Sequence, residues 1–327
     1  MAANRCGVFV DTGSLTAGAV NAPDLDFAAI RALPIDWQYN PATNPDQVVE
    51  RLQGAAVVVT NKVVLDASRL ARLPDLELIA VAATGVNNVD LEAARNQGIG
   101  VCNVTGYATP SVVQHVFMLL LCLLRRLPAY TTALEQGRWQ QSPHFCLLDY
   151  PIEELQDKTL GIIGYGELGR AVAGMGEAFG MRSLIARRDR RDQRRGRVDL
   201  DELLQQADVV SLHCPLSEQT RQLIGADQLA LMKADAILIN TARGGIVDES
   251  ALYRALANGR LGGAGIDVLE REPPDEKTPL LQARLENLIV TPHIAWASRA
   301  ARQRLLDQVA RNIDSYLRGG PLRNAVV

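Results

Sequence analysis

The amino-acid sequence predicts an α/β protein with two domains, each a doubly wound parallel sheet covered by helices. The first observation is length, because 327 residues exceed the roughly 100–200 residues of an ordinary domain. The second is that short apolar, β-branched runs alternate with helical patterns along the chain. Strands that are apolar on both faces and separated by helices are typical of parallel sheets buried between helix layers.

The strands and helices follow from this alternation. In the first half, strands are expected at 6–11, 55–61, 76–83 and 100–104, separated by helical segments such as 45–53 and 89–98. The second of these helices ends at Gly98, a residue suited to the position after a helix. In the second half, strands are expected at 159–166, 181–186, 207–214, 235–242, 264–269 and 287–293.

The domain boundary is expected near 103–109, where Gly, Thr and Pro precede a long apolar helix at 110–126. The chain is expected to cross back near 294–300, so that a terminal helix at about 298–318 joins the first domain. We therefore predict a discontinuous domain, 1–103 plus 295–327, with residues 104–294 inserted as a second domain. A cleft between two such domains is a usual place for a ligand.

Composition excludes several classes of protein. Hydrophobic residues make up 47% and charged residues 22%, as in globular proteins. The net charge of −3 argues against a nucleic-acid partner, since such proteins are expected to be basic. Five cysteines without a CxxC pair argue against a disulfide framework and against a zinc site, and no metal is expected.

Targeting and membrane segments are not predicted either. The N-terminus lacks the long apolar run of a signal peptide. The most apolar run, 112–124, is interrupted by Gln114 and His115 and is shorter than the roughly 20 residues that span a bilayer. We therefore expect a cytoplasmic protein with no membrane partner.

The sharpest local motif is TLGIIGYGELG at 159–169, with glycines in GxGxxG spacing between an expected strand and an expected helix. The first glycine permits a tight turn, the second lets the backbone approach a pyrophosphate, and the third allows close helix packing. The helix N-terminus offers unpaired N–H groups to phosphates. This predicts a Rossmann nucleotide-binding domain rather than a glycine-rich turn of another α/β fold. The cofactor-binding residues expected there are Gly164, Gly166, Glu167, Leu168 and Gly169.

The end of the next strand bears on the choice of cofactor. NAD-binding proteins usually place Asp or Glu there to hold the ribose hydroxyls, whereas this chain has Arg187 followed by Arg188. A guanidinium can bind a 2′-phosphate in bidentate fashion. We therefore predict that NADP(H) is preferred, with NAD(H) possible because Asp189 could reach the ribose after a loop shift. The further arginines, from Arg190 onward, are interpreted as a solvated loop.

Three later segments each end an expected strand and place an ionisable side chain there. They place Arg243 in NTARGG, Glu272 in DVLEREPP and His293 in TPHIAW. Because ligands bind at the carboxyl ends of strands in a doubly wound sheet, these three groups could meet beside a nicotinamide. A single histidine after proline is more often structural, so the hypothesis depends on the complete set.

These segments and the glycine motif together resemble the D-isomer-specific 2-hydroxyacid dehydrogenase family. The resemblance spans nearly the whole chain and includes 83–90, 159–169, 213–216, 240–249, 267–274 and 291–293. Segments 145–155, 164–169 and 291–298 look most like the glycerate dehydrogenases, also called hydroxypyruvate reductases. The resemblance implies a flavodoxin-like substrate domain around the inserted Rossmann domain, and a homodimer.

The resemblance also implies a reaction. Hydride would pass from a nicotinamide to a 2-keto acid, hydroxypyruvate or glyoxylate, and His293 matches the general acid that protonates the carbonyl oxygen. Glu272 matches its carboxylate partner, whose charge would favour the imidazolium form. Arg243 matches the residue that binds the substrate carboxylate and polarises the carbonyl.

Other positions match supporting residues of the family. Besides Arg243 and His293, the substrate would be bound by backbone N–H groups in the turn with Thr84, Gly85 and Val86. Asp267 matches the residue that binds the nicotinamide amide, and the remaining cofactor-lining matches are Thr109, His213, Pro215 and Thr241. The family's common Ile-Gly after the histidine is replaced by Ile-Ala-Trp, so Trp296 is expected to shape the pocket.

Some residues and functions stay open at this point. His115 is expected to be a hydrogen-bonded core histidine and His144 a structural one, while Trp139 could reach a partner subunit or pack on the surface. A non-catalytic nucleotide-sensing protein of the same fold is an alternative, although the complete Arg–Glu–His set argues against it. A dehydrogenase for another 2-hydroxy acid is a second alternative. Formate dehydrogenase relatives replace the acidic partner of the histidine, and Glu272 therefore disfavours them.

Overall fold

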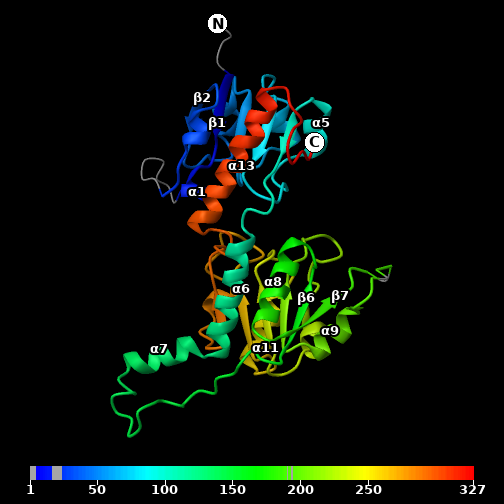
Figure 1. Cartoon of the computed structure of the whole chain (residues 1–327). Helices are drawn as coiled ribbons and strands as arrows, with labels where there is room; N and C mark the ends of the chain where they lie inside the picture. The colour runs from blue at the N-terminus through cyan, green and yellow to red at the C-terminus, as the bar shows by residue number, and fades with distance from the viewer. Residues whose placement is uncertain (1–4, 17–23, 190, 193) are drawn as a thin grey trace. The chain divides into compact units, whose positions relative to one another are not determined.

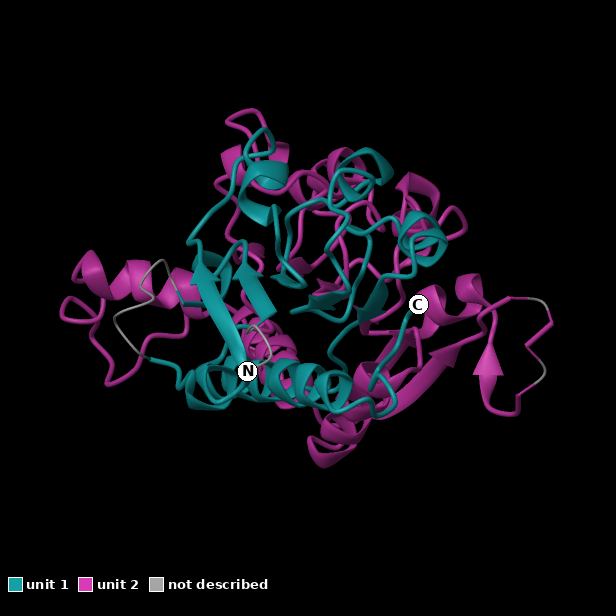
Figure 2. Ribbon diagram, turned by 90° about the horizontal axis from the view of Figure 1, so that it is seen from above, with its two compact units in different colours: residues 1–108, 297–327 teal, residues 109–296 magenta. Residues whose placement is uncertain are grey.

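The structure is a computed structural model that describes residues 5–16, 24–189, 191–192 and 194–327. The chain divides into two compact units, shown in Figure 2. Unit 1 comprises Met1–Ala108 and Ala297–Val327, and unit 2 comprises Thr109–Trp296. The chain thus leaves unit 1 a few residues after position 103 and returns to it just after position 295.

Unit 1 contains a five-stranded parallel sheet in the order β2-β1-β3-β4-β5 (Figure 1). Its strands are β1 (Arg5–Phe9), β2 (Ile35–Tyr39), β3 (Val57–Thr60), β4 (Leu78–Val81) and β5 (Gly100–Cys102). Its helices are α1 (Gly13–Thr16), α2 (Ala28–Arg31), α3 (Val48–Leu52), α4 (Ala67–Leu70), α5 (Leu91–Asn96) and α13 (Arg299–Leu317). Strands β3 and β4 are buried along their whole length, which is the pattern that predicted them.

The terminal helix α13 and the residues after it complete unit 1. Leu305, Val309 and Ile313 of α13 are buried, and the helix packs against α2 and β4. The amide of Asn312 donates to the carbonyl of Asn103 at 2.8 Å. Beyond α13, the backbone N–H of Val326 donates to the carbonyl of Val101 at 2.7 Å, so that the end of the chain lies beside β5.

Unit 2 contains a seven-stranded parallel sheet in the order β12-β11-β10-β9-β6-β7-β8. Its strands are β6 (Thr159–Ile163), β7 (Arg182–Ala186), β8 (Arg197–Val198), β9 (Val209–Leu212), β10 (Ile237–Asn240), β11 (Gly263–Ile266) and β12 (Leu288–Val290). Its helices are α6 (Thr109–Leu124), α7 (Leu127–Glu135), α8 (Glu167–Ala178), α9 (Leu200–Gln206), α10 (Ala226–Leu231), α11 (Glu249–Ala257) and α12 (Pro279–Gln282). The expected α/β class with two parallel sheets is confirmed.

Helices cover both faces of the sheet in unit 2. A Cβ atom added to Gly176 of α8 would lie 2.7 Å from Leu160, whereas one added to Gly161 would lie 2.6 Å from Leu203 of α9. Because neighbouring residues of a strand point to opposite faces, α8 and α9 lie on opposite sides. Helix α6 packs beside α8 (Figure 1) and contacts β10, β11 and β12.

Two strands, β2 and β8, were missing from the expected set. In β2 exposed residues alternate with buried or half-buried ones, and this strand lies at the edge of its sheet. Strand β8 is only two residues long and is likewise an edge strand. Neither has the continuous apolar run that marks a central parallel strand.

The hydropathy of the helices bears on whether any of them could span a membrane. Within the described residues no single helix combines the required length and hydropathy. Helices α6 and α7 meet the test only as a pair, by length and composition, and they are bent by 59° at the break between them.

Candidate functional site

The glycine turn after β6 has the geometry that its spacing predicts. Gly164 has φ of 97°, and a Cβ there would lie 2.5 Å from the backbone nitrogen of Cys214. A Cβ on Gly169 would lie 2.1 Å from the carbonyl oxygen of Gly164, so only glycine lets α8 pack this closely on the turn. A Cβ on Gly166 would meet nothing within 4 Å, and this side of the turn is therefore open to a ligand.

This turn lies where the order of the strands reverses. Strand β6 has β7 on one side and β9 on the other, and ligands of doubly wound sheets bind at such a switch point. Helix α8 begins at Glu167, with Gly166 before it and no side-chain cap on its first N–H groups. The hydroxyl of Thr109, at the start of α6, donates to the carboxylate of Glu167. Leu168 is half-buried beside Glu167.

Two buried polar atoms near this turn have no partner among the described residues. They are Nδ1 of His213 and Oγ1 of Thr241, which follow the paired strands β9 and β10. Burial lowers the pKa of His213 to about 4, so its imidazole is neutral near pH 7, and its Nε2 lies 2.8 Å from Oγ of Ser211. Because an unsatisfied buried polar atom is costly, both atoms fit a bound ligand with hydrogen-bonding groups. A dinucleotide provides such groups, and the residues present fit it.

Arg187 stands at the end of β7, as expected. Its backbone N–H donates to the carbonyl of Val198 at 2.8 Å, and its guanidinium lies 3.3 Å from a carboxylate oxygen of Asp199. The backbone N–H of Arg188 donates to Asp192 at 3.1 Å. The side chain of Asp189 accepts the backbone N–H of Arg191 at 2.8 Å, within the loop, and Arg190 lies outside the described residues.

The catalytic candidates follow three neighbouring strands, β10, β11 and β12. Hydrogen bonds continue beyond the strand ends, from the N–H of Asp267 to the carbonyl of Asn240 at 2.9 Å and from the N–H of His293 to the carbonyl of Asp267 at 2.8 Å. The loops that contain Arg243, Glu272 and His293 therefore lie at the same edge of the sheet in unit 2.

His293 and Glu272 form a close pair. Nδ1 of His293 lies 2.6 Å from Oε2 of Glu272, while Oε1 of Glu272 accepts the backbone N–H of Leu269 at 3.0 Å. An ionised carboxylate only accepts hydrogen bonds, so Nδ1 of His293 is the donor. Within the described residues no hydrogen bond engages Nε2, and 27% of the side chain is exposed. The pair thus leaves Nε2 as the atom that can exchange a proton with a ligand.

Arg243 lies on the adjacent loop. Its side chain is exposed, donates to the carbonyl of Ala242 at 2.7 Å and forms no ion pair within the described residues. The turn is held by Asn240, whose amide donates to the carbonyl of Arg243 at 3.0 Å. A Cβ on Gly244 would lie 1.8 Å from the carbonyl oxygen of Leu269, so the loop after β10 packs directly on the loop that contains Glu272.

Asp267 is fully buried, and its carboxylate organises the segment after β12. It accepts the backbone N–H groups of Ile294 and Ala295, both at 2.9 Å, and the hydroxyl of Thr291 at 2.6 Å. Desolvation by burial raises the pKa of Asp267, but hydrogen bonds, first that from His115, outweigh it, so the pKa lies below its ordinary value. Its expected contact with the nicotinamide amide stays a prediction.

The other predicted substrate residues belong to unit 1. Thr84, Gly85 and Val86 follow β4, and the hydroxyl of Thr84 donates to the carbonyl of Val104 at 2.8 Å. The amide of Asn103 donates to the carbonyl of Thr84 at 2.7 Å. Both bonds hold the turn at Thr84, its first residue. In unit 2, the carbonyl of Pro215, a predicted cofactor residue, accepts the hydroxyl of Thr220 at 2.6 Å.

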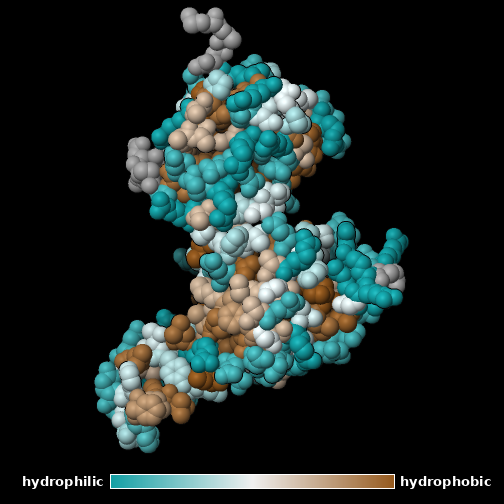
Figure 3. Space-filling model, viewed as in Figure 1, coloured by the Kyte–Doolittle hydropathy of each residue, from teal (hydrophilic) through white to brown (hydrophobic). Residues whose placement is uncertain are grey.

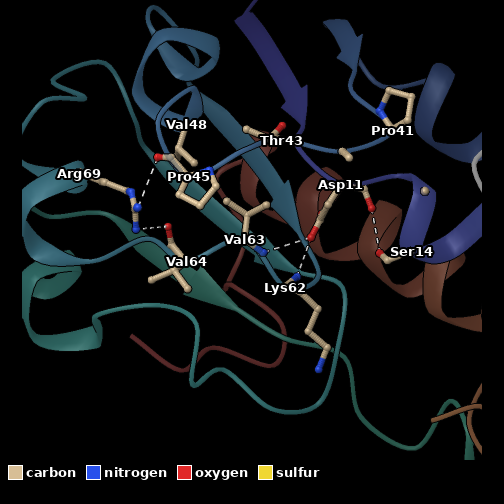
Figure 4. Close-up of a pocket in the computed structure, with 12 residues that line it drawn as sticks. Asp11, Ser14, Pro41, Thr43, Pro45, Val48, Lys62, Val63, Val64 and Arg69 are labelled. Atoms are coloured by element: carbon tan, nitrogen blue, oxygen red, sulfur yellow. Dashed lines mark hydrogen bonds between the residues drawn. The ribbon is translucent and has the colours of Figure 1, made fainter. Parts of the chain in front are cut away.

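Unit 1 also contains a cavity of about 680 Å³ that sequence reasoning missed (Figure 4). The loops after β1, β2 and β3 line it, at the point where the strand order of this sheet reverses. Its carboxylate, Asp11, accepts the backbone N–H groups of Asn61 at 2.8 Å, Lys62 at 2.6 Å and Val63 at 3.2 Å. A signal for this site was present in the sequence, because Asp11 is the last residue of an expected strand.

Comparisons with known proteins agree with this geometry. The family model described as D-isomer specific 2-hydroxyacid dehydrogenase, NAD binding domain, matches residues 117–295. The glycerate dehydrogenase of Methylorubrum extorquens is 49% identical over 284 residues, which cover 87% of this chain and 90% of that protein. The chain belongs to the D-isomer specific 2-hydroxyacid dehydrogenase family. The expected resemblance is confirmed.

Solved structures are similar to this chain over nearly its whole length. The TT0316 protein of Thermus thermophilus is 35% identical with a TM-score of 0.86, over 98% of this chain and 100% of that chain. The NADPH-dependent glyoxylate/hydroxypyruvate reductase of Sinorhizobium meliloti, solved with NADP and malonate, is 27% identical with a TM-score of 0.82, over 99% and 97% of the two chains. As a family member the chain is an NAD(P)-dependent D-2-hydroxyacid dehydrogenase, with its Rossmann domain in unit 2 and a nicotinamide cofactor.

Proposed function

We propose that the chain reduces small 2-keto acids, hydroxypyruvate and glyoxylate, to D-glycerate and glycolate, with NADPH as its preferred reductant. The observation that carries the proposal is the 2.6 Å pair of His293 and Glu272 at the sheet edge where the loop of Arg243 also lies. The names of the relatives in Methylorubrum extorquens and Sinorhizobium meliloti support the choice of substrates.

The mechanism follows from the chemistry of the three side chains. When bound, the reduced nicotinamide supplies a hydride to the carbonyl carbon of the keto acid. His293 donates the proton from Nε2 to the carbonyl oxygen, and the carboxylate of Glu272 on Nδ1 stabilises the imidazolium before this transfer. Arg243 has guanidinium donors without an ion pair among the described residues and binds the substrate carboxylate. The backbone N–H groups of the turn Thr84–Val86 bind the substrate, and those of the turn Gly164–Gly169 bind the cofactor.

The reaction is tested by the oxidation of NADPH with hydroxypyruvate, glyoxylate and pyruvate, each compared as kcat/KM. We expect hydroxypyruvate to give the highest value. No turnover with any of the three, together with measurable binding of NADPH, would favour a nucleotide-sensing protein. A preference for pyruvate or a bulkier keto acid would instead favour a dehydrogenase for another 2-hydroxy acid.

The preference for NADP(H) rests on Arg187 and Arg188 at the end of β7. In the present arrangement the guanidinium of Arg187 contacts Asp199 at 3.3 Å, so binding of a 2′-phosphate would replace this ion pair. Arg187→Asp should lower the NADPH/NADH ratio of kcat/KM by roughly 10-fold or more, as expected for a lost charge-assisted contact. Asp199→Asn is the matched variant, because it frees Arg187 and should raise the ratio. A ratio that neither variant changes would reject the phosphate site.

Unit 2 has an exposed apolar surface, which we propose as the contact with a second copy of the chain. Around α7 and the loop after it, the exposed large hydrophobic residues are Leu127, Leu134, Trp139, Phe145, Leu148 and Ile152 (Figure 3). Phe145 is 91% exposed, and its carbonyl accepts Nε1 of Trp139 at 2.9 Å. Monomers rarely expose such a group, so we include a homodimer in the proposal. The cytoplasmic location stays a prediction from the sequence.

The dimer has a direct test in solution. Light scattering of the wild-type chain should give twice the mass of one chain, and a Phe145→Asp, Leu148→Asp double variant should give a single chain mass with an unchanged far-UV spectrum. An exposed residue elsewhere on unit 2, Tyr253, provides the control Tyr253→Asp, which should stay dimeric. A wild-type monomer would reject this part of the proposal.

A further inference from the structure

We propose that His115 of α6 is a positioning residue, which holds the segment 291–295 in the conformation that directs His293 toward Glu272. This inference rests on the proposed function, since it concerns the delivery of a proton by His293. It adds a residue from a helix that contributes no group to the reaction itself.

The first contacts are those of His115 with the segment. Nε2 of His115 lies 2.9 Å from Oγ1 of Thr291 and 3.4 Å from Oδ1 of Asp267, and the Thr291 hydroxyl lies 2.6 Å from the same carboxylate oxygen. The single hydroxyl proton of Thr291 goes to the carboxylate, which can only accept. Thr291 therefore accepts from His115, and Nε2 of His115 must be the protonated nitrogen.

The network continues from Asp267 to the catalytic residue. The Asp267 carboxylate accepts the N–H groups of Ile294 and Ala295, and its backbone carbonyl accepts the N–H of His293 at 2.8 Å. His115 thus reaches both sides of His293 through one carboxylate. The side chains of His115 and Asp267 are 9% and 0% exposed, so water competes little for these bonds.

Helix α6 also contacts the other end of segment 291–295. Ser111, one helical turn before His115, donates from its hydroxyl to the carbonyl of Ala295 at 2.7 Å. One face of α6 therefore holds Thr291 at the start of the segment and Ala295 at its end. The segment is fixed between α6 and Asp267.

The backbone conformation of His293 explains why the segment needs these contacts. His293 has φ of 55°, in the left-handed region that residues other than glycine rarely adopt. A residue keeps such a conformation only where its surroundings over-determine it. Without the contacts from α6 the segment can relax toward ordinary backbone angles, which would turn the imidazole away from Glu272.

The test compares two substitutions of His115. His115→Leu keeps the size and removes the donor, whereas His115→Gln keeps an N–H donor near the position of Nε2. We expect the leucine variant to lower kcat roughly 10- to 100-fold, the range that misplacement of a catalytic group costs. KM for hydroxypyruvate and Kd for NADPH should change less than about twofold, and the glutamine variant should recover most of kcat.

A control residue lies on the same helix. Gln114 is exposed, so Gln114→Leu changes α6 without touching the network and should leave kcat unchanged. If His115→Leu does not fold, Thr291→Val takes its place, because it removes the bridging hydroxyl with little change in shape. A normal kcat in the leucine variant, or equal losses in the leucine and glutamine variants, would overturn the proposal.

A proton spectrum separates this inference from the proposed reaction. The 2.6 Å bond from Nδ1 of His293 to Glu272 should give a low-field proton resonance, assigned by its loss in His293→Gln. The resonance should disappear or shift in His115→Leu and persist in His115→Gln. An inactive wild-type chain would reject the proposed function while this measurement still decides the positioning role. An unchanged resonance in His115→Leu would contradict it.

Discussion

Each sheet of the molecule has an aspartate at its carboxyl edge, half-buried Asp11 in unit 1 and fully buried Asp267 in unit 2, and each holds a neighbouring loop. Asp11, after β1 in unit 1, accepts N–H groups from the loop that follows β3. Asp267, after β11 in unit 2, accepts N–H groups from the segment that follows β12. In both units a carboxylate thus anchors the loop of a neighbouring strand.

The two carboxylates differ in their electrostatics. Burial raises the pKa of Asp11, and the backbone N–H groups of Lys62, Asn61 and Val63 lower it by less. Burial also raises the pKa of Asp267, but there the side chains of His115 and Thr291 add to the backbone donors, and the net pKa is lowered. The side-chain donors therefore favour the ionised form of Asp267. Asp11, whose hydrogen bonds come from backbone N–H groups, is more readily protonated.

The largest expected effect is the difference between two asparagine variants. Asp267→Asn should lower kcat by roughly 100-fold or more, because an amide N–H would face a backbone N–H where the carboxylate now accepts, and His293 would be displaced. Asp11→Asn should cost less than about 10-fold, since the loop that Asp11 holds contains none of the proposed catalytic residues. Steady-state kinetics on hydroxypyruvate and the Kd for NADPH measure both. Equal losses of kcat in the two variants would contradict the different roles given to Asp267 and Asp11.

The pH dependence of stability should have opposite signs at the two sites. The lowered pKa of Asp267 gives stability that is present above the ordinary value of 3.8 and is lost as the pH falls through the folded value. The raised pKa of Asp11 gives stability that is fully present below 3.8 and is lost as the pH rises through its folded value.

Amide hydrogen exchange can follow the two sites separately. Protection factors of Ile294 should fall at the acid end, and those of Asn61 should fall as the pH rises above 3.8. Each dependence should flatten in the matching asparagine variant. If the protection factors of Ile294 and Asn61 changed in the same direction with pH, the opposite pKa shifts of Asp267 and Asp11 would be contradicted.

The central strands and the glycine turn could be predicted from sequence because their signals are local. Strand β4 is a continuous apolar run, β3 and β9 are mostly apolar and buried along their whole length, and Gly164, Gly166 and Gly169 are fixed by spacing. Edge strands β2 and β8 were missed because an edge strand has a neighbouring strand on one side only. Its residues are therefore less buried, and its sequence lacks a continuous apolar run. The expected roles of Arg243, Glu272 and His293 came from their places after strands and from the family resemblance.

The remaining features depend on contacts between distant parts of the sequence. His115 is a histidine in an apolar helix until the fold brings it to Thr291 and Asp267. Asp199 lies twelve residues beyond Arg187, and no local pattern in the sequence predicts their ion pair. Positions in the sequence identify which groups are available, whereas their partners are set by the packing of helices on the sheet.

The most direct test of the central claim is the kcat of His293→Ala with hydroxypyruvate and NADPH, measured beside the Kd for NADPH. Loss of the general acid should lower kcat by roughly 100- to 10,000-fold while Kd stays within about twofold of the wild-type value. A variant that turns over at nearly the wild-type rate would show that the proton comes from another group.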